Sequence, residues 1–204
     1  MLILNELNSQ TARILNEIIL NAGIILWPSG GVYGLACDAT NNAAVSKIYE
    51  FKQRDCGKSL SIIANKNTAY NYACIPDTAS KIINEYWPDF IGIIVPKKPA
   101  IKDFVTAGKS TIGLVCSSIF NEFLADNILM PLASTSANLS GEKEIIDTAT
   151  AIKTFENKVE AIIVYDHNNG CLNTLIEFDE QNNFKIIREG KYSLAELKNK
   201  LALQ

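Results

Sequence analysis

The spacing of apolar and polar positions predicts a helix near the start of the chain. Across residues 9–22 the apolar side chains recur at helical spacing, with Ser9 expected as the N-cap and Gly23 as the stop. The positions on this face are Ile14, Leu15, Ile18, Ile19 and Ala22. An amphipathic helix is therefore expected to open the fold.

A short apolar run at residues 24–27 predicts a buried strand after this helix. The run ends at Pro28, Ser29, Gly30 and Gly31. Proline removes a backbone donor there, and the two glycines permit unusual backbone angles. A glycine-containing loop is therefore expected directly after the first predicted strand.

Apolar runs and helical patterns alternate along the rest of the chain. Strands are predicted at residues 60–64, 91–95, 111–116, 132–134, 161–165, 174–178 and 184–187. Helices are predicted at residues 41–52, 78–87, 118–128, 147–155 and 193–203. The alternation is typical of an α/β layer architecture, and the polar turn at 179–183 makes the last two strands a hairpin, so the sheet is expected to be mixed. No repeat, linker or charge shift marks a boundary, and residues 1–204 are predicted to form a single domain.

Composition narrows the class of protein. The net charge of −3 gives no global basic field for capturing nucleic acid, so contact with RNA would need a local patch. No apolar segment reaches the roughly 18 residues that cross a bilayer, and the N-terminus lacks a signal-type pattern, so a soluble, cytoplasmic protein without a membrane partner is expected. The five cysteines are widely spaced and are expected to be reduced thiols.

A cluster of cations lies in residues 52–60, where Lys52, Arg54 and Lys58 fall within seven residues. Such a cluster could grip a polyphosphate, and arginine in particular binds phosphate or carboxylate bidentately. The alternative is that these side chains stay solvated and complement the dipole of the preceding predicted helix. The segment alone leaves both interpretations open.

A second candidate is the small polar segment at residues 134–138, which includes Ser134, Ser136 and Asn138. Hydroxyls, an amide and neighbouring backbone N–H groups can surround an anion or a ribose. The alternative is a strand end followed by a capped turn, because Ser, Thr and Asn also bond their own backbone.

Several familiar catalytic patterns are absent from the sequence, including the glycine-rich phosphate loop, the nucleophile elbow and the zinc-binding HExxH motif. The single histidine, His167, lies among turn-forming residues and is expected to be an exposed loop residue. Catalysis by a histidine base is therefore not predicted.

Five short motifs stand out along the chain. They are W-P-S-G-G-V-Y-G-L at 27–35, K-Q-R-D-C-G-K-S-L at 52–60, Y-W-P at 86–88, S-T-S-A-N at 134–138 and I-I-R-E-G at 186–190. Together they resemble the YrdC-like threonylcarbamoyl-AMP synthase (TsaC) family, stand in the family's order and cover about residues 10–190. The resemblance implies a twisted mixed α/β sheet flanked by helices, with a cationic concave face where ATP and threonine meet.

The resemblance also implies roles for particular residues. Lys52 and Arg54 would be catalytic, Ser29 and Tyr33 would bind threonine, and the ATP-binding set would be Lys52, Arg54, Lys58, Ser134, Ser136, Asn138 and Arg188. Under this assignment, replacing Lys52 or Arg54 by alanine is expected to lower pyrophosphate release sharply without unfolding the protein.

The implied reaction joins L-threonine and bicarbonate as an N-carboxylate, whose oxygen attacks the α-phosphorus of ATP and expels pyrophosphate. The reaction needs alignment and fixed cations more than acid–base groups. Mg²⁺ is expected, without a metal site made by protein alone. The product, threonylcarbamoyl-AMP, would pass to a downstream tRNA threonylcarbamoyltransferase, and contact with tRNA itself is a further possibility.

Four positions depart from the family pattern. Gly30 falls in a loop that usually carries an acidic residue, Val115 stands where an arginine is expected, Asp55 replaces a proline, and Asp89 falls where a glycine is usual. These departures keep two alternatives open: a paralogue that binds nucleotide or RNA without synthesis, and an ATP-dependent enzyme of this fold with another substrate.

Overall fold

The computed structural model describes residues 1–165, 168–179 and 181–201. Its helices are α1 (Ser9–Leu20), α2 (Asn42–Lys52), α3 (Ala69–Tyr72), α4 (Asp77–Tyr86), α5 (Asp103–Thr106), α6 (Ile119–Asn127), α7 (Thr148–Phe155) and α8 (Leu194–Leu201). Its strands are β1 (Leu2–Leu4), β2 (Ile25–Pro28), β3 (Tyr33–Asp38), β4 (Ser61–Ile63), β5 (Ile91–Pro96), β6 (Thr111–Val115), β7 (Leu132–Ser136), β8 (Ala161–Ile163), β9 (Thr174–Phe178) and β10 (Phe184–Arg188).

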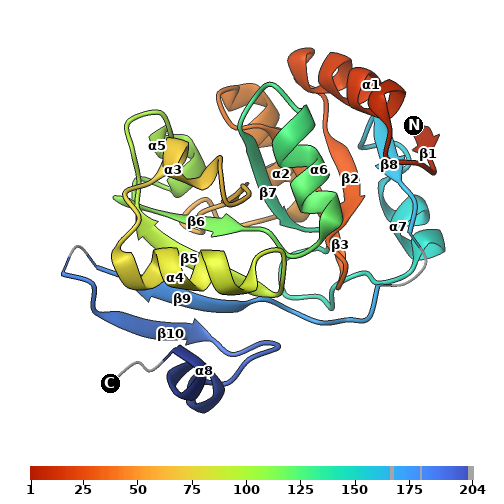
Figure 1. The fold of residues 1–204 in the computed structure, drawn as a ribbon. Helices are drawn as coiled ribbons and strands as arrows, with labels where there is room; N and C mark the ends of the chain where they lie inside the picture. The colour runs from red at the N-terminus through yellow and green to blue at the C-terminus, as the bar shows by residue number, and fades with distance from the viewer. Residues whose placement is uncertain (166–167, 180, 202–204) are drawn as a thin grey trace.

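Within the described ranges the strands form one mixed sheet, in the order β1-β8-β2-β3-β7-β4-β6-β5-β9-β10. The sheet contains parallel pairs, such as β4 with β6 and β5 with β9, as well as antiparallel pairs, such as β3 with β7 and the β9–β10 hairpin. The chain begins at one edge of this sheet and ends beside the other (Figure 1). The predicted α/β class, the mixed sheet and the C-terminal hairpin are confirmed.

Some boundaries differ from the sequence prediction. The N-cap of α1 is Asn8 and not Ser9, because the Asn8 side chain accepts a hydrogen bond from the backbone N–H of Thr11. The left-handed residue after the helix is Ala22, with φ 57°, and not Gly23. The sequence analysis also missed β1, β3, α3 and α5. β3 was missed because all six of its residues are buried, so it shows no alternation of polar and apolar residues.

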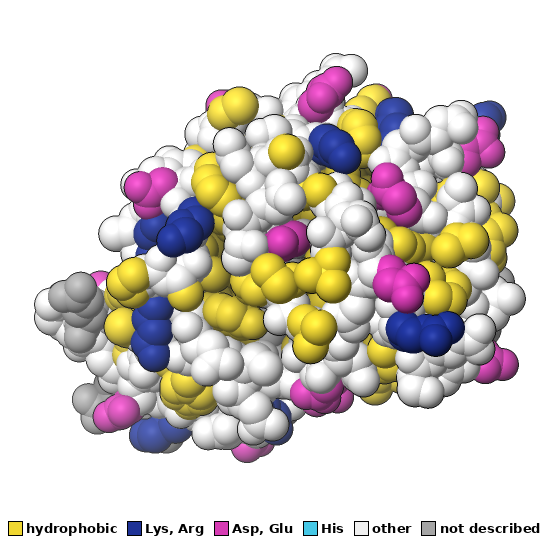
Figure 2. All heavy atoms as spheres, turned by 90° about the horizontal axis from the view of Figure 1, so that it is seen from above, with side chains coloured by type: hydrophobic (Ala, Val, Ile, Leu, Met, Phe, Trp, Pro, Cys, Tyr) yellow, Lys and Arg dark blue, Asp and Glu magenta, His cyan; other side chains and the backbone are white. Residues whose placement is uncertain are grey.

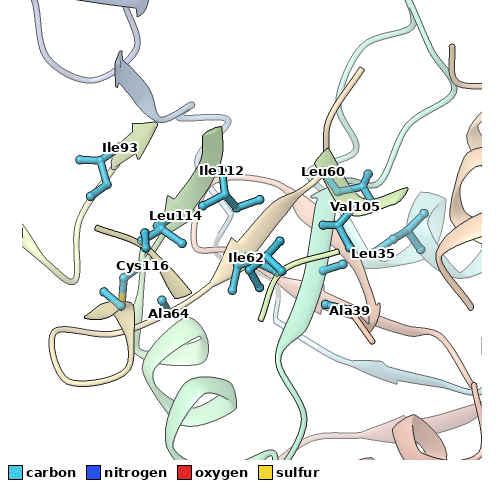
Figure 3. Close-up of a cluster of buried hydrophobic side chains, with 14 of the residues drawn as sticks. Leu35, Ala39, Leu60, Ile62, Ala64, Ile93, Val105, Ile112, Leu114 and Cys116 are labelled. Carbon is cyan, nitrogen blue, oxygen red and sulfur yellow. The ribbon is translucent and has the colours of Figure 1, made fainter. Parts of the chain in front are cut away.

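One face of the sheet carries large apolar side chains and holds the main core. Residues that alternate along the central strands, including Leu35, Ile62, Ile93, Ile112 and Leu114, are all fully buried (Figure 3). Helices α2, α4 and α7 contribute buried side chains to the same cluster. This face is therefore closed to solvent along the middle of the sheet.

The opposite face is covered over only part of its area. Helices α1 and α6 pack there against one end of the central strands, where Ile25, Ile63 and Leu132 form a second apolar cluster. Further along the same strands, the side chains on this face become small and polar, as at Ser61 and Ser134. The change from large to small residues leaves a hollow beside the two helices.

Candidate active site

The hollow is a cavity of about 520 Å³ whose floor is made of two neighbouring rows of paired strand positions. In one row Ser134 on β7 pairs with Ser61 on β4, and Ser61 pairs with Gly113 on β6; in the next row Gly34 on β3 pairs with Ser136 on β7. Because paired residues project to the same face, and so do residues two apart along a strand, both rows present hydroxyls and bare backbone to the cavity. The volume falls in the range of small-molecule sites.

Charged side chains from separate elements reach this cavity. Those described in its lining are the cations Arg54, Lys58, Lys109 and Arg188, together with the carboxylates Glu144 and Glu177. Four cations against two carboxylates give the described cavity lining a local positive excess, although the net charge of the chain is −3. On the face shown in Figure 2, by comparison, Lys and Arg side chains lie among Asp and Glu side chains.

Arg54 is held against its own loop beside the cavity. Its Nε donates to the backbone carbonyl of Lys58 at 3.2 Å, and its Nη2 donates to that of Ser59 at 3.0 Å. Burial lowers the pKa of Arg54, and the nearby Tyr49 and Asp55 oppose this shift. Arginine keeps its proton under such conditions, so Arg54 presents a fixed positive charge.

Arg188 reaches the cavity from the end of β10. Its Nε and Nη2 both donate to the backbone carbonyl of Asn173, at 3.2 and 3.0 Å. Burial lowers its pKa, and the charge of Glu144 raises it in part. A Cβ on the nearby Gly190 would lie 2.2 Å from the carbonyl oxygen of Leu172, so glycine is needed for this close approach. The spacing of the Arg-x-Gly motif therefore has a steric reason.

Lys52 is not part of the described cavity lining. Its side chain is buried, with 1% exposure, and its Nζ donates to the carbonyl oxygens of Ser136 and Asn138 and to Oδ1 of Asn138. The two Asn138 contacts are 2.6 and 2.9 Å long. Asn138 lines a separate, smaller hollow outside the cavity. Lys52 therefore lies behind the polar segment 134–138 and fixes its course.

The burial of Lys52 bears on the expected behaviour of its alanine variant, which stays a prediction. An alanine at this position removes the donor for three partly buried oxygens, so we now expect the variant to lose stability as well as activity. Burial, with a smaller effect from Arg54, lowers the pKa of Lys52 to about 8, while Glu144 opposes the shift. The ammonium group thus keeps its proton at neutral pH.

The two residues expected to bind threonine line the cavity, but their hydroxyls have partners elsewhere. Ser29 Oγ donates to the carbonyl of Val32 at 2.8 Å. Tyr33 is fully buried, and its Oη lies 2.7 Å from Oγ1 of Thr148 and accepts from the backbone N–H of Tyr165 at 3.0 Å. Tyr33 belongs to the main apolar cluster on the closed face of the sheet, and Ser29 holds the turn at residues 29–32. The contact of both residues with threonine stays a prediction.

The loop after β2, which lacks the family's acidic residue, requires glycine at positions 30 and 31. Gly30 has φ +88°, a conformation that other residues rarely adopt. A Cβ on Gly31 would lie 2.0 Å from the carbonyl oxygen of Cys171. The loop therefore packs directly on backbone, and glycine at these positions is part of how the cavity closes.

The other departures lie in different surroundings. Val115 lines the cavity beside Gly92 and forms part of an apolar wall with Leu175. Asp55 is exposed and accepts from the backbone N–H of Gly57 at 2.9 Å. Asp89 lies outside the described lining of the cavity. The carboxylates that reach the cavity are Glu144 and Glu177 instead, and sequence analysis missed both.

Asp89 has a different set of partners. Burial alone would raise the pKa of Asp89, but hydrogen bonds from the Lys191 and Tyr192 side chains and from the Phe90 backbone lower it below its ordinary value. The carboxylate is therefore held in its charged form by the segment that follows Arg188.

Sequence analysis missed Lys109 as well. A left-handed turn at Ala107 and Gly108 brings Lys109 to the cavity. Thr106, which is fully buried, ties this turn to the Arg54 loop, because its carbonyl accepts from Ser59 Oγ at 2.8 Å. The only sequence signal was a lysine after Ala-Gly, which is also common in ordinary turns.

A second hollow, the cysteines and the single histidine complete the description. A more open hollow of about 780 Å³ lies over β10 and α8 and shares Arg188 and Ile187 with it. All five cysteines are free thiols, and burial raises the pKa of the Cys37 thiol to about 12. His167 lies outside the described residues. No described helix is long and apolar enough to cross a membrane.

The fold and cavity define a class of protein: a mixed α/β domain with a cation-lined, small-residue cavity on one face of its sheet. The family model for Sua5, YciO and YrdC proteins, described as "Telomere recombination", matches residues 17–190. The chain therefore belongs to the Sua5/YciO/YrdC family, as the motifs predicted.

Individual relatives agree with this assignment. A protein from Wigglesworthia glossinidia brevipalpis named threonylcarbamoyl-AMP synthase is 32% identical over 173 residues, covering 82% of this chain and 87% of its own. One from Methanocaldococcus jannaschii, whose name assigns the same activity provisionally, is 34% identical over 163 residues, covering 78% and 77%. The crystal structure of P. abyssi Sua5 complexed with L-threonine has a TM-score of 0.89 and 25% identity, and it covers 98% of this chain. This chain spans 60% of that Sua5 chain.

Proposed function

We propose that this protein is an L-threonylcarbamoyladenylate synthase, which forms threonylcarbamoyl-AMP and pyrophosphate from L-threonine, bicarbonate and ATP. Curated relatives carry that name, and a relative of the same fold binds L-threonine. The observation that carries the proposal is the cavity of about 520 Å³, where cations from several elements surround a floor of small and hydroxyl residues. A cavity of this kind suits a ligand with a polyphosphate and a polar nucleoside.

The cations have distinct places in this proposal. Arg54, Lys58 and Lys109 come from two loops tied together at Ser59, and they would hold the triphosphate. Arg188 comes from the other part of the cavity wall and would close over the nucleotide. Ser134 and Ser136 project from the floor and would hold the sugar or the α-phosphate. Fixed charges of this kind act where negative charge develops as pyrophosphate leaves.

The chemical step needs no histidine. Threonine and bicarbonate first give an N-carboxylate with loss of water. One carboxylate oxygen then bonds to the α-phosphorus of ATP while the bond to the β-phosphate bridging oxygen breaks and pyrophosphate leaves. The nucleophile is already an anion, so alignment and charge stabilisation dominate the barrier.

Lys52 would act on this step through the segment 134–138. Its ammonium donates to the carbonyls of Ser136 and Asn138, and the Ser136 hydroxyl in turn donates to Oδ1 of Asn138. Arg54 is then the catalytic cation, and Lys52 is a positioning residue. Direct contact of Lys52 or Asn138 with ATP stays a prediction from the family resemblance.

Further parts of the proposal rest on the family alone. Mg²⁺ would enter with the ATP phosphates, and Glu144 and Glu177 are carboxylates in the described cavity lining that could join them. The product would pass to a downstream tRNA threonylcarbamoyltransferase in the cytoplasm. Direct contact with tRNA, and residues 1–204 acting as one domain, are further expectations.

The test is pyrophosphate release from ATP with bicarbonate, with and without L-threonine, and with other amino acids in parallel. Threonine-dependent release is expected, and Arg54→Ala should lower it by about 100-fold or more, the range found when one transition-state donor is removed. Arg13→Ala is the matched control, because Arg13 is exposed on α1. Release with a different amino acid would replace threonine as the substrate. ATP binding without release would support the nucleotide-binding alternative.

A further inference from the structure

The segment that follows Arg188 is fastened to the loop before β5 by one carboxylate. Asp89 accepts from Lys191 Nζ at 2.7 Å with Oδ1 and at 2.9 Å with Oδ2, and its Oδ2 accepts from Tyr192 Oη at 2.5 Å. The Asp89 side chain is 22% exposed. We call Asp89, Lys191 and Tyr192 the Asp89 latch.

Aromatic rings surround this latch. Lys191 Nζ lies 5.5 Å from the centre of the Phe90 ring and 5.2 Å from that of Tyr192. The Tyr192 ring meets Tyr86 of α4 edge to face, with centroids 5.2 Å apart. The cation and both rings are thus held together, which lowers the entropy cost of keeping the latch in one geometry.

The backbone of the same segment is held by Thr174. Thr174 Oγ1 accepts from the N–H groups of Gly190 and Tyr192, at 3.0 and 2.9 Å, and donates to the Tyr192 carbonyl at 2.7 Å. Thr174 is fully buried in β9. The position of residues 190–192 is therefore fixed by the latch at one side and by Thr174 at the other.

Arg188 lies directly before this fixed segment. Its guanidinium donates to the Asn173 carbonyl, and Oδ1 of Asn173 accepts from Ser117 Oγ at 2.9 Å. Arg188, Asn173 and Ser117 all line the cavity. The direction of the guanidinium thus depends on how residues 188–192 lie against residues 172–174.

We propose that Asp89 is a positioning residue for nucleotide binding, which holds Arg188 toward the cavity through Lys191 and Tyr192. The proposal rests on the proposed function, because it takes Arg188 to be an ATP ligand. The latch acts at a distance, since Asp89 is not among the residues that line the cavity.

The test is a double-mutant cycle with Asp89→Asn, Arg188→Ala and the variant that carries both, read out as the dissociation constant for ATP by calorimetry. Asp89→Asn should weaken binding by about 10-fold, near the lower end of the range for losing hydrogen bonds to a charged group. If Asp89 acts through Arg188, the double variant should bind no more weakly than Arg188→Ala alone. Additive effects would overturn the proposal, because they would make Asp89 a structural residue independent of Arg188.

A matched control and a second variant complete the experiment. Asp103→Asn removes a different ion pair, that with Lys97 at 2.5 Å, and should leave ATP binding unchanged. If Asp89→Asn does not fold, Tyr192→Phe removes one latch hydrogen bond and keeps the ring against Tyr86. Its amides at residues 190 and 192 should exchange faster than in the unmodified protein, and unchanged exchange would contradict the latch.

The two proposals fail in different ways. Loss of threonine-dependent pyrophosphate release in the unmodified protein would refute the synthase reaction, while the ATP-binding cycle would still decide whether Asp89 positions Arg188. An additive cycle in a protein that does release pyrophosphate would refute only the latch. Absence of ATP binding by the unmodified protein would overturn both.

Discussion

The buried ammonium of Lys52 gives the sharpest prediction. Lys52→Met keeps an unbranched side chain of similar length in place and removes the charge and its donors. Three oxygens are affected: the carbonyls of Ser136 and Asn138 and the Oδ1 of Asn138. Oδ1 keeps a partner, because Ser136 Oγ donates to it at 2.6 Å. Two carbonyl oxygens therefore lose the ammonium donor.

The expected loss of stability follows from these two groups. A buried acceptor without a partner costs about 1–3 kcal/mol, and removing a buried charge returns part of that cost. The free energy of unfolding should therefore fall by about 2–4 kcal/mol, which is a large share of the total for a single domain. For a chain of this size each kcal/mol lowers Tm by about 2–4 °C.

The assay is equilibrium unfolding in urea at pH 7, where burial has lowered the pKa of Lys52 to about 8 and the ammonium is still charged. Lys47→Met is the control, because Lys47 is exposed on the same helix, α2. The free energy of unfolding of Lys47→Met should differ from that of the unmodified protein by no more than about 0.5 kcal/mol. Pyrophosphate release is measured for both variants well below their Tm.

One result would refute the reasoning. If Lys52→Met unfolds at the same urea concentration as Lys47→Met and nevertheless loses pyrophosphate release, then Lys52 does not hold the segment 134–138. Its effect would then be on the phosphates directly, as the family motif implies. Loss of stability with activity restored by low temperature or by saturating ATP would support the positioning role.

Three further outcomes are expected. Lys109→Ala should raise the KM for ATP by about tenfold and weaken its salt dependence, while the exposed Lys102→Ala should not, as steady-state kinetics at two salt concentrations will show. Gly190→Ala should lower Tm and ATP affinity together, because its Cβ would collide with backbone, whereas in Gly57→Ala the Cβ would meet only the end of the Asp55 side chain, at 3.3 Å, and Tm should change much less. Asp89→Asn should destabilise the protein at pH 7, and the difference in unfolding free energy between variant and unmodified protein should shrink as pH falls below about 4. The reason is that folding lowers the pKa of Asp89, so its stabilising effect is present above the pKa of the unfolded state and is lost as the folded carboxylate becomes protonated. A difference that stays constant from pH 7 to pH 3 would contradict this sign.

The regular elements were largely predictable from local pattern. The strand at residues 174–178 matches β9 (Thr174–Phe178), because its alternation records one buried and one partly exposed face. β3 (Tyr33–Asp38) was not found, because a strand buried on both sides has no such alternation. The short helices α3 and α5 were missed because one turn carries no helical period.

The candidate site was predictable in part. Four of the five quoted motifs contribute residues to one cavity, including Arg54, Lys58 and Arg188, whereas none of residues 86–88 is in its described lining. Lys109 and Glu144 were missed, because each lies in a loop whose local pattern fits an ordinary turn. For Lys52 the sequence predicted a residue of the cavity, but the structure places its side chain in the interior at the end of α2. Spacing alone cannot distinguish a buried lysine from an exposed one.

The sequence by itself determined the α/β class, the order of most strands and helices along the chain, the glycines at 30, 31 and 190, and the family. These follow from local periodicity and from short motifs, which are properties of neighbouring residues. Only the tertiary structure decided that Gly34, Ser61, Gly113 and Ser134 form one floor, because strand order and register join residues that are far apart in sequence. It also decided which charges face the cavity and which, like Lys52 and Asp89, hold that cavity in shape from outside its lining.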